Sequence, residues 1–388
     1  MMQKKNIYLM YAVSCLQGMV FYGPIATLYR QAQGVSVFEI TLIESISLAL
    51  CLALELPWGI VADRIGYKKT MVFCNLLYLI SKIVFWRASG FPAFLLERIM
   101  LSVVMAGLSG VDTSILYLSA AKENSQKVFG FYNSLGTAGL LAAAFVYSAV
   151  VGDNYRLAGF LTVVSYGAAA ALSLFLSEVK AGEREKTAAK EFYSCLKRTL
   201  SDKYLFLFLL GIAFLNETHQ TVTVFLNQLL YVRAGIGSKA IGWLYMFVTV
   251  IGMCGVFSAA LTRRLGERFL IRACYLSAAA SCLLLAFTDI PLGAAGGIVM
   301  LRTAFGLFSP LQTRLQNEQI TTADRATALS INAVIIDSAG VGTNLVFGAL
   351  AEKSLTAALL AGACLCVTGL FFIERIWRAK RFSGADVS

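Results

Sequence analysis

Long apolar runs separated by short polar turns dominate the chain. Each run holds about 20 residues, the length that an α-helix needs to cross the hydrocarbon core of a membrane. In lipid, a span of this length must satisfy its own backbone hydrogen bonds, as a helix does, and the sequence lacks the short alternating segments of a membrane β-barrel. The pattern therefore predicts an all-α integral membrane protein with 12 transmembrane helices. The predicted spans are Asn6–Tyr29, Ser36–Ala62, Thr70–Trp86, Ala93–Ala120, Val128–Val151, Leu157–Leu176, Tyr204–Val232, Ala240–Leu261, Phe269–Phe287, Leu292–Leu315, Ala326–Leu350 and Leu355–Ile373.

The composition agrees with a chain that lies mostly in lipid. Of its 388 residues 58% are hydrophobic and only 14% are charged, and the mean hydropathy is +0.72. Soluble domains hold roughly 25% charged residues, so this chain has too few polar side chains to face water on all sides. Lys4 and Lys5 precede the first apolar run, but that run is too long for a typical signal peptide and no clear small-residue cleavage site follows it. We therefore expect the first run to be a membrane span.

The basic residues are divided unevenly between the two sides of the predicted membrane. If the N-terminus is cytoplasmic and the spans alternate, 23 Lys and Arg residues fall in cytoplasmic segments and 6 in outer segments. Cytoplasmic loops carry an excess of Lys and Arg, so this division predicts that both termini are cytoplasmic. The net charge of +11 is then a signal of topology and of contact with anionic lipids, and it does not indicate nucleic-acid binding. The sequence thus predicts a multi-pass protein of the cytoplasmic (inner) membrane.

The chain divides into two similar halves around one polar stretch. Residues 178–203 form the only long polar segment, and we expect them to be a cytoplasmic connector. The connector separates an N-terminal bundle of six spans, residues 1–177, from a C-terminal bundle of six spans with a short tail, residues 204–388. Short stretches also recur at a nearly constant offset, which is typical of duplicated membrane bundles. The matching stretches are Asp63–Gly66 with Arg263–Gly266, Arg98 with Arg302, and Phe131–Gly136 with Ser330–Ile335.

A charged turn bounded by glycines interrupts the apolar pattern between the second and third spans. It reads GIVADRIGYKK, and its basic residues suit contact with the anionic inner leaflet. The stretch resembles the loop signature of the major facilitator superfamily, G-x-x-x-D-[RK]-x-G-[RK]-[RK], although Tyr67 stands where a basic residue is usual. The matching residues, which we treat as a gating-loop motif, are Gly59, Asp63, Arg64, Gly66, Lys68 and Lys69.

The resemblance covers the whole chain, because its length, its twelve spans, its duplicated halves and its basic central segment also fit. It implies the major facilitator fold, in which two pseudo-symmetric six-helix bundles alternate access to a site near the membrane midplane. It implies a monomer that moves a small-molecule substrate, exchanges protons, contacts membrane lipids and needs no cofactor. It also implies that Asp63 docks near residues 324–326, at the start of the eleventh span, and latches the halves shut on the cytoplasmic side. A plain basic loop is the alternative, but that alternative does not explain a lone acidic residue.

The seventh span carries the densest group of polar residues, Asn216 to Gln220. Ionisable side chains at membrane depth are functional candidates by default. A carboxyl group there is expected to be neutral in a dry cavity and charged in a wet one, which suits proton coupling. The alternative for Glu217 is a hydrogen-bonded carboxyl group with a structural role only, and for His219 a satisfied polar group on the face away from the cavity. For Asp112 it is a partner of the basic loop, and for Asp337 a role in gating. The proton-coupling candidates are Glu217, Asp112, His219 and Asp337.

In the superfamily the first, fourth, seventh and tenth spans line the central cavity, so the resemblance places polar and aromatic residues of these spans near the substrate. Arg98 and Asp112, fourteen residues apart on the fourth span, are predicted to share a helix face. Arg302 is predicted to pair with Asp337 or with an anionic group of the substrate. The substrate-cavity candidates are Gln17, Phe21, Tyr22, Arg98, Asn216, Gln220, Arg302 and Phe305.

Compact size and acids at membrane depth resemble the small bacterial drug–proton antiporters, so proton-coupled efflux is the first functional prediction. The fifth span lacks the glycine–proline motif of such exporters, and a symporter that imports a nutrient or metabolite is the alternative. A channel or a passive scaffold is a further alternative, distinguished by flux without coupling. An enzyme is not predicted, because the sequence has no HExxH motif, no phosphate-binding loop and no Ser/His/Asp set. With one histidine and nine cysteines that form no CxxC pair, we expect no metal site.

Overall fold

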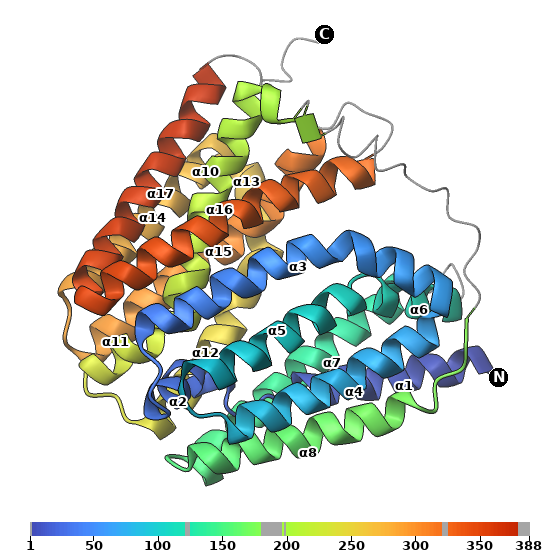
Figure 1. The fold of residues 1–388 in the computed structure, drawn as a ribbon. Helices are drawn as coiled ribbons and strands as arrows, with labels where there is room; N and C mark the ends of the chain where they lie inside the picture. Colours follow the sequence, from blue (N-terminus) through green and yellow to red (C-terminus); the bar gives the residue numbers. More distant parts are fainter. Residues whose placement is uncertain (1, 121–124, 180–195, 198, 320–324, 379–388) are drawn as a thin grey trace. The chain divides into compact units, whose positions relative to one another are not determined.

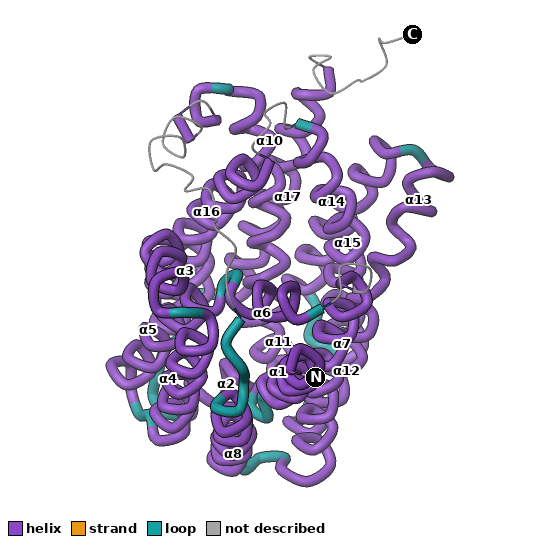
Figure 2. The backbone as a smooth tube through the Cα atoms, turned by 90° about the vertical axis from the view of Figure 1, so that its right-hand side faces the viewer, coloured by secondary structure: helices purple, strands orange, loops and turns teal. Residues whose placement is uncertain are grey.

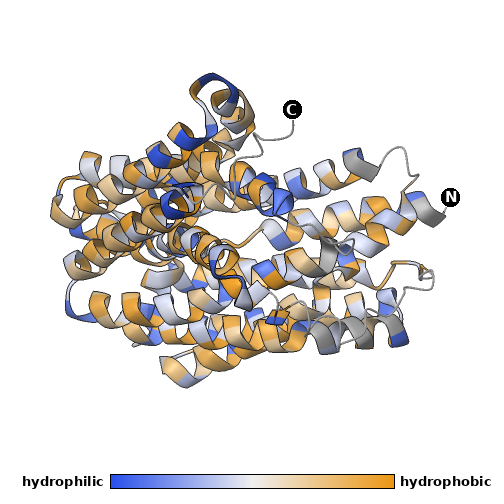
Figure 3. Ribbon diagram, turned by 90° about the horizontal axis from the view of Figure 1, so that it is seen from above, coloured by the Kyte–Doolittle hydropathy of each residue, from blue (hydrophilic) through white to orange (hydrophobic). Residues whose placement is uncertain are grey.

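The computed structural model describes residues 2–120, 125–179, 196–197, 199–319 and 325–378. Helices account for nearly all of this part of the chain, and no strand occurs among these residues (Figures 1 and 2). Hydrophobic residues, orange in Figure 3, recur along the helices, as expected for helices that face lipid or one another.

The chain forms two compact units. Unit 1 comprises residues 1–185 together with residues 237–246, and unit 2 comprises residues 186–236 and 247–388. The predicted division placed residues 237–246 in the C-terminal half, whereas here they group with unit 1. The cause is close packing, because Gly242 lies so near the Ser148 side chain that an added Cβ atom would overlap it. Most of the predicted connector lies outside the described residues.

Unit 1 consists of helices that follow one another with short turns. Its elements are α1 (Met2–Gly18), η1 (Gly23–Ile25), α2 (Ala26–Ala32), α3 (Val37–Ile65), α4 (Tyr67–Arg87), α5 (Gly90–Leu108), α6 (Val111–Ser119), α7 (Ser125–Val146), the π-helical η3 (Tyr147–Val151) and α8 (Tyr155–Ser173).

The remaining elements begin after the connector, and all belong to unit 2 except the first part of α12. They are α10 (Lys203–Gln220), the π-helical η4 (Thr221–Leu226), α11 (Asn227–Arg233), α12 (Ser238–Ile251), η5 (Gly252–Phe257), α13 (Ser258–Leu265), α14 (Glu267–Phe287), α15 (Pro291–Glu318), α16 (Arg325–Lys353) and α17 (Leu355–Arg378).

Twelve helical stretches within the described residues are long and apolar enough to cross a membrane, which confirms the predicted number of spans. Some spans consist of consecutive helical segments rather than one straight helix. The first span contains α1, η1 and α2, and the seventh contains α10, η4 and α11. The fourth contains α5 and α6, which are separated at Gly110, where φ is +81°. Arg98 and Asp112 therefore lie on two different helices, and the continuous helix on which the predicted common face rests is interrupted between them.

The two units repeat the same pattern of helix packing, which confirms the predicted duplication. In unit 1, α1 packs on α7 and α8, α4 packs on α5 and α8, and α3 packs on α5. In unit 2, α10 packs on α16 and α17, α14 packs on α15 and α17, and η5 packs on α15. These pairs correspond span by span when the seventh span is matched with the first.

The turns after the second and eighth spans are built in the same way. Gly66 ends α3 and precedes α4 with φ at +95°, and Gly266 ends α13 and precedes α14 with φ at +82°. Only glycine adopts this region readily, so each glycine lets one helix stop and the next begin without a longer loop. The offset of 200 residues seen in the sequence thus has a structural counterpart.

Candidate functional site

The predicted gating loop is anchored within unit 1 by the carboxylate of Glu178. The backbone N–H of Lys68 donates to Glu178 Oε1 at 3.1 Å, and the same carboxylate lies over Gly66. The N-terminus of a helix carries partial positive charge, so the carboxylate stabilises the start of α4. Arg64 and Lys69 are exposed. The Asp63 side chain and residues 320–324 are not among the described parts, so the Asp63 latch stays a prediction.

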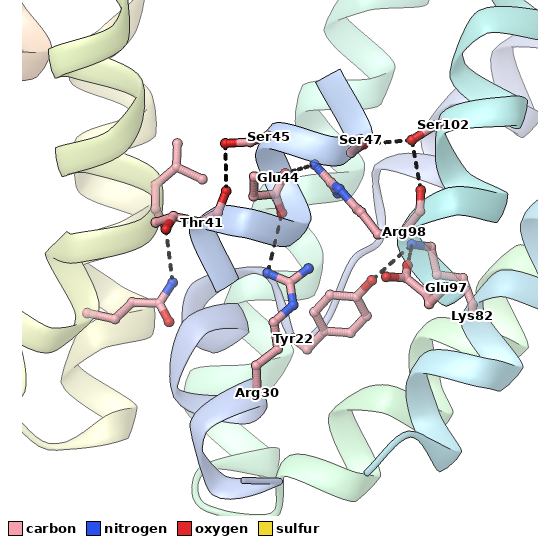
Figure 4. A network of polar contacts seen from close by, with 12 residues as sticks. Tyr22, Arg30, Thr41, Glu44, Ser45, Ser47, Lys82, Glu97, Arg98 and Ser102 are labelled. Carbon is pink, nitrogen blue, oxygen red and sulfur yellow. Dashed lines mark hydrogen bonds and ion pairs between the residues drawn. The ribbon is translucent and has the colours of Figure 1, made fainter. Parts of the chain in front are cut away.

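One buried carboxylate in unit 1 is shared by two arginines (Figure 4). Glu44 of α3 forms an ion pair with Arg98 of α5 and a longer one, 3.6 Å, with Arg30 of α2. Arg30 was predicted to lie in an outer segment, but its side chain is buried. The sequence prediction missed it because α2 continues the first span past Tyr29, and Arg30 turns toward the interior of the unit.

A second buried ion pair lies beside the first. Lys82 Nζ of α4 donates to Glu97 Oε1 at 3.1 Å and to the Tyr22 hydroxyl at 3.0 Å. The ammonium group also lies 5.2 to 5.8 Å from the ring centres of Tyr22, Tyr78 and Tyr166, within the range of cation–π attraction.

Neither Lys82 nor Glu97 was among the candidate residues. Both are ionisable residues inside predicted spans. Treating every ionisable residue at membrane depth as a functional candidate would therefore have included them. Tyr22 was predicted to line a cavity. It is instead buried in this cluster, where its ring stacks on Phe85 at 3.9 Å between ring centres.

The other candidates of unit 1 have local partners. Gln17 Nε2 donates to Asn75 Oδ1 at 2.7 Å, and the backbone N–H of Phe21 donates to Thr162 Oγ1. The Asp112 carboxylate accepts from the backbone N–H of Thr113 and from the Tyr132 hydroxyl at 3.3 Å. Neither of these partners, which are those found among the described residues, is a basic residue of the gating loop, and the carboxylate lies at the start of α6.

In unit 2, His219 of α10 contacts two of the predicted candidates. Arg302 Nη1 of α15 donates to His219 Nε2 at 3.0 Å, and the imidazole ring stacks on Phe305 at 3.8 Å with the planes 7° apart. A guanidinium group can only donate, so Nε2 must accept and the imidazole is neutral in this arrangement. The Arg302 side chain lies over Gly252, where any larger residue would overlap it.

Glu217, one turn before the π-helical segment, is placed differently from the other buried acids. Its side chain is only 7% exposed, and no hydrogen bond or ion pair to it occurs among the described residues. The carboxyl group lies against the backbone of Gly340 in α16, where a Cβ atom would be 2.8 Å from each of its oxygens. Asp337, one turn earlier on α16, is near enough to act on its charge.

Of the remaining polar residues of the seventh span, some are buried and others are exposed. Asn216 Oδ1 is buried and accepts no hydrogen bond within the described part of the chain, whereas Gln220 is exposed. Thr221 is the first residue of η4, and its Oγ1 donates to Asn344 Oδ1 of α16 at 2.9 Å. Irregular π-helical turns are frequent at functional sites, and this one directly follows the predicted polar group. The described residues contain no cluster of three or more His, Cys, Asp or Glu side chains that could hold a metal ion.

Two curated proteins resemble the chain in sequence. An uncharacterized MFS-type transporter of Methanocaldococcus jannaschii is 27% identical over 171 residues, which are 42% of this chain and 44% of that protein. The chain thus matches less than half the length of this relative. The Bacillus subtilis protein named "Putative niacin/nicotinamide transporter NiaP" is 23% identical over 331 residues, 80% of this chain and 82% of that protein.

Solved structures resemble the fold over almost the whole chain. The nucleoside transporter NupG superposes with a TM-score of 0.80 at 16% identity, covering 97% of this chain and 99% of that one. A D-xylose–proton symporter superposes with a TM-score of 0.73 at 16% identity, covering 98% of each chain. At these identities the likeness concerns the fold. The family description "Major Facilitator Superfamily" matches residues 7–343, and with twelve spans in two similar units the chain belongs to the Major Facilitator Superfamily of transporters.

Proposed function

We propose that the protein is a secondary active transporter that moves a small organic molecule by alternating access and couples the movement to protons through Glu217. The observation that carries this proposal is the position of the Glu217 carboxyl group, buried against Gly340 without a hydrogen-bond or ion-pair partner among the described residues. An isolated buried carboxylate is unfavourable by several kcal/mol, so Glu217 is stable there in its protonated form.

Loss of that proton requires water or a cation to reach the carboxylate. The nearby Asp337 repels Glu217 when both acids are charged. Release of the Glu217 proton is therefore expected when a change of conformation lets water reach the carboxyl group. His219 fits the coupling role less well, because Arg302 already donates to its ring nitrogen. Asp112 remains the second candidate, since the partners of its carboxylate within the described residues, a backbone N–H and a tyrosine hydroxyl, are neutral.

The driving force available to such a site is sufficient for transport against a gradient. For one proton and an uncharged substrate, about 100 mV of membrane potential supplies roughly 2.3 kcal/mol. One unit of pH difference adds about 1.4 kcal/mol. Together these support a substrate gradient on the order of 500-fold.

Two directions of coupling follow from this chemistry. The sequence favours efflux by antiport. Uptake by symport is the second candidate, because the D-xylose–proton symporter shares the fold and one relative is named for niacin and nicotinamide. Nucleosides, niacin-like compounds and sugars therefore belong in the first substrate panel together with cationic drugs.

The test is transport in proteoliposomes with an imposed pH gradient. The unaltered protein is expected to concentrate its substrate on the side set by the sign of the gradient, and that sign separates antiport from symport. Glu217→Gln is expected to lose pH-driven accumulation while retaining measurable exchange of substrate across the membrane. Glu318→Gln, a change at an exposed acid of α15, is the matched control and is expected to behave like the unaltered protein. Accumulation by Glu217→Gln with unchanged pH dependence would exclude this coupling site.

A further inference from the structure

The buried ionic cluster of unit 1 contains more positive than negative charge. Arg30, Lys82 and Arg98 provide three cations, whereas Glu44 and Glu97 provide two anions. No other acidic side chain in the described part of the chain forms an ion pair with these three bases. A buried charge without a counter-charge is strongly unfavourable, so the cluster lacks one negative charge.

Aromatic rings compensate for only part of this excess. Lys82 has three tyrosine rings as well as Glu97, whereas Arg30 has one ring among the described residues, Phe85, with its centre 5.7 Å from the guanidinium carbon. A cation–π contact stabilises a cation by less than a full counter-charge does. The excess is therefore located at the two arginines that share Glu44.

These arginines also have unused hydrogen-bond donors. The Nε atoms of Arg30 and Arg98 are buried and have no partner in the described part of the chain. Each guanidinium has five N–H donors, and Glu44 takes one contact from each arginine. A second carboxylate is the group that both guanidinium planes are suited to bind, because its two oxygens match the spacing of the donors.

Arg98 is the accessible member of the cluster. Its side chain is 26% exposed, whereas those of Arg30 and Glu44 are each 6% exposed. It lies eight residues after Gly90, the start of α5, which is about 12 Å along the helix. Arg98 thus lies within the apolar stretch Gly90–Ser119, which is long enough to cross a membrane, so a molecule in the transport path is favoured over a lipid headgroup as the source of the anion.

We infer that Arg98, with Arg30 behind it and Glu44 between them, binds the carboxylate of a monoanionic organic substrate. This inference rests on the proposed transport function and names the substrate class. One carboxylate balances the three cations and two anions of the cluster. A dianion would reverse the excess, and a cation would increase it, so both are expected to bind more weakly.

The experiment measures binding at equilibrium by the thermal unfolding of the purified full chain, without a membrane or a gradient. Sodium benzoate or sodium acetate replaces sodium chloride at constant ionic strength, and benzamide serves as the neutral analogue of benzoate. The unaltered protein is expected to show a saturable rise of the unfolding midpoint with at least one carboxylate and none with benzamide. Because no gradient is present, failure of proton coupling through Glu217 would not change this result.

Four variants separate the site from a merely structural ion pair. Arg98→Gln and Arg30→Gln each leave Glu44 with one arginine, so both are expected to fold and to bind the carboxylate about tenfold or more weakly. Glu44→Gln removes the competing acid and is expected to bind the carboxylate more tightly. Arg87→Gln, at an exposed arginine near the same end of unit 1, is the control and is expected to bind like the unaltered protein.

Should an Arg→Gln variant fail to fold, Arg98→Lys keeps the charge without the planar donor pair, and it is expected to bind with reduced affinity. Four results would overturn the inference. They are no midpoint shift with either carboxylate, an equal shift with benzamide, unchanged binding in Arg98→Gln and Arg30→Gln, and loss of binding in Glu44→Gln to the extent seen in Arg98→Gln.

Discussion

Lys82 and Glu217 illustrate two ways in which this chain keeps an ionisable side chain away from water. Lys82 has a carboxylate, a hydroxyl and three aromatic rings around its ammonium group, so its charged form is fully compensated. Glu217 has no such hydrogen-bond or ion-pair partner in the described part of the chain and lies against the backbone of Gly340. The first arrangement stabilises one charge state permanently, whereas the second makes the charge state depend on access of water.

At this scale we predict the effect of Gly340→Ala. The added methyl group would be 2.8 Å from the carboxyl carbon and both oxygens of Glu217, so the carboxyl group has to move. Because the Glu217 side chain is flexible, we expect the variant protein to fold. We also expect pH-driven transport to fall by about tenfold to a hundredfold, because the carboxyl group that carries the proton is displaced.

Gly342→Ala on the same helix is the matched control. Nothing lies within 4 Å of the Cβ position of Gly342, so transport in this variant should equal that of the unaltered protein. Proteoliposome transport over a series of pH values gives the measurement. If both variants transport equally well, the contact between Gly340 and Glu217 is irrelevant to coupling.

At the scale of elements, close contact between helices depends on glycines at particular faces. In unit 1, α1 and α7 approach so closely that a Cβ atom at Gly139 would overlap the carbonyl oxygen of Cys15, and one at Gly18 would overlap that of Gly136. Small residues allow this approach in membranes, where packing rather than water exclusion holds helices together. The contacts are with backbone carbonyl oxygens, which cannot rotate away from an added side chain as a flexible side chain could.

We therefore expect Gly139→Ala to destabilise unit 1 by about 1–3 kcal/mol through overpacking. Gly130→Ala, on the same helix α7, has nothing within 4 Å of the new Cβ atom and should be neutral or slightly stabilising. Thermal unfolding of the purified variants, together with their yield as monodisperse protein, would compare them. Equal midpoints would mean that α1 and α7 can separate without loss of stability.

At the scale of the whole molecule, the question is which ends of the twelve spans face the cytoplasm. The turns at Gly66 and Gly266 belong to the same side by the repeat, and both are rich in basic residues. The excess of 23 over 6 basic residues assigns that side to the cytoplasm, which is our proposal for the orientation.

The orientation is tested by single cysteines in a background whose nine native cysteines are replaced. Asn154→Cys lies in the exposed turn before α8 and should react with an impermeant thiol reagent applied to intact cells. Arg264→Cys, in the exposed last turn of α13, should react only after the membrane is permeabilised. The opposite pattern would reverse the orientation, and permeabilised cells provide the control for reactivity at both positions.

Features that depend on a short window of the chain were predictable before the structure was known. The number of spans follows from the length of apolar runs, and the turn at Gly66 from one glycine between charged residues, so both were predicted correctly. The tertiary structure decided which side chains meet. Glu44 binds Arg30 and Arg98 from three separate helices, Arg302 reaches His219 across 83 positions, and Gly340 makes room for Glu217. Such pairings depend on how each helix is rotated and where it is interrupted, as at Gly110, and these are set by packing between distant segments rather than by local pattern.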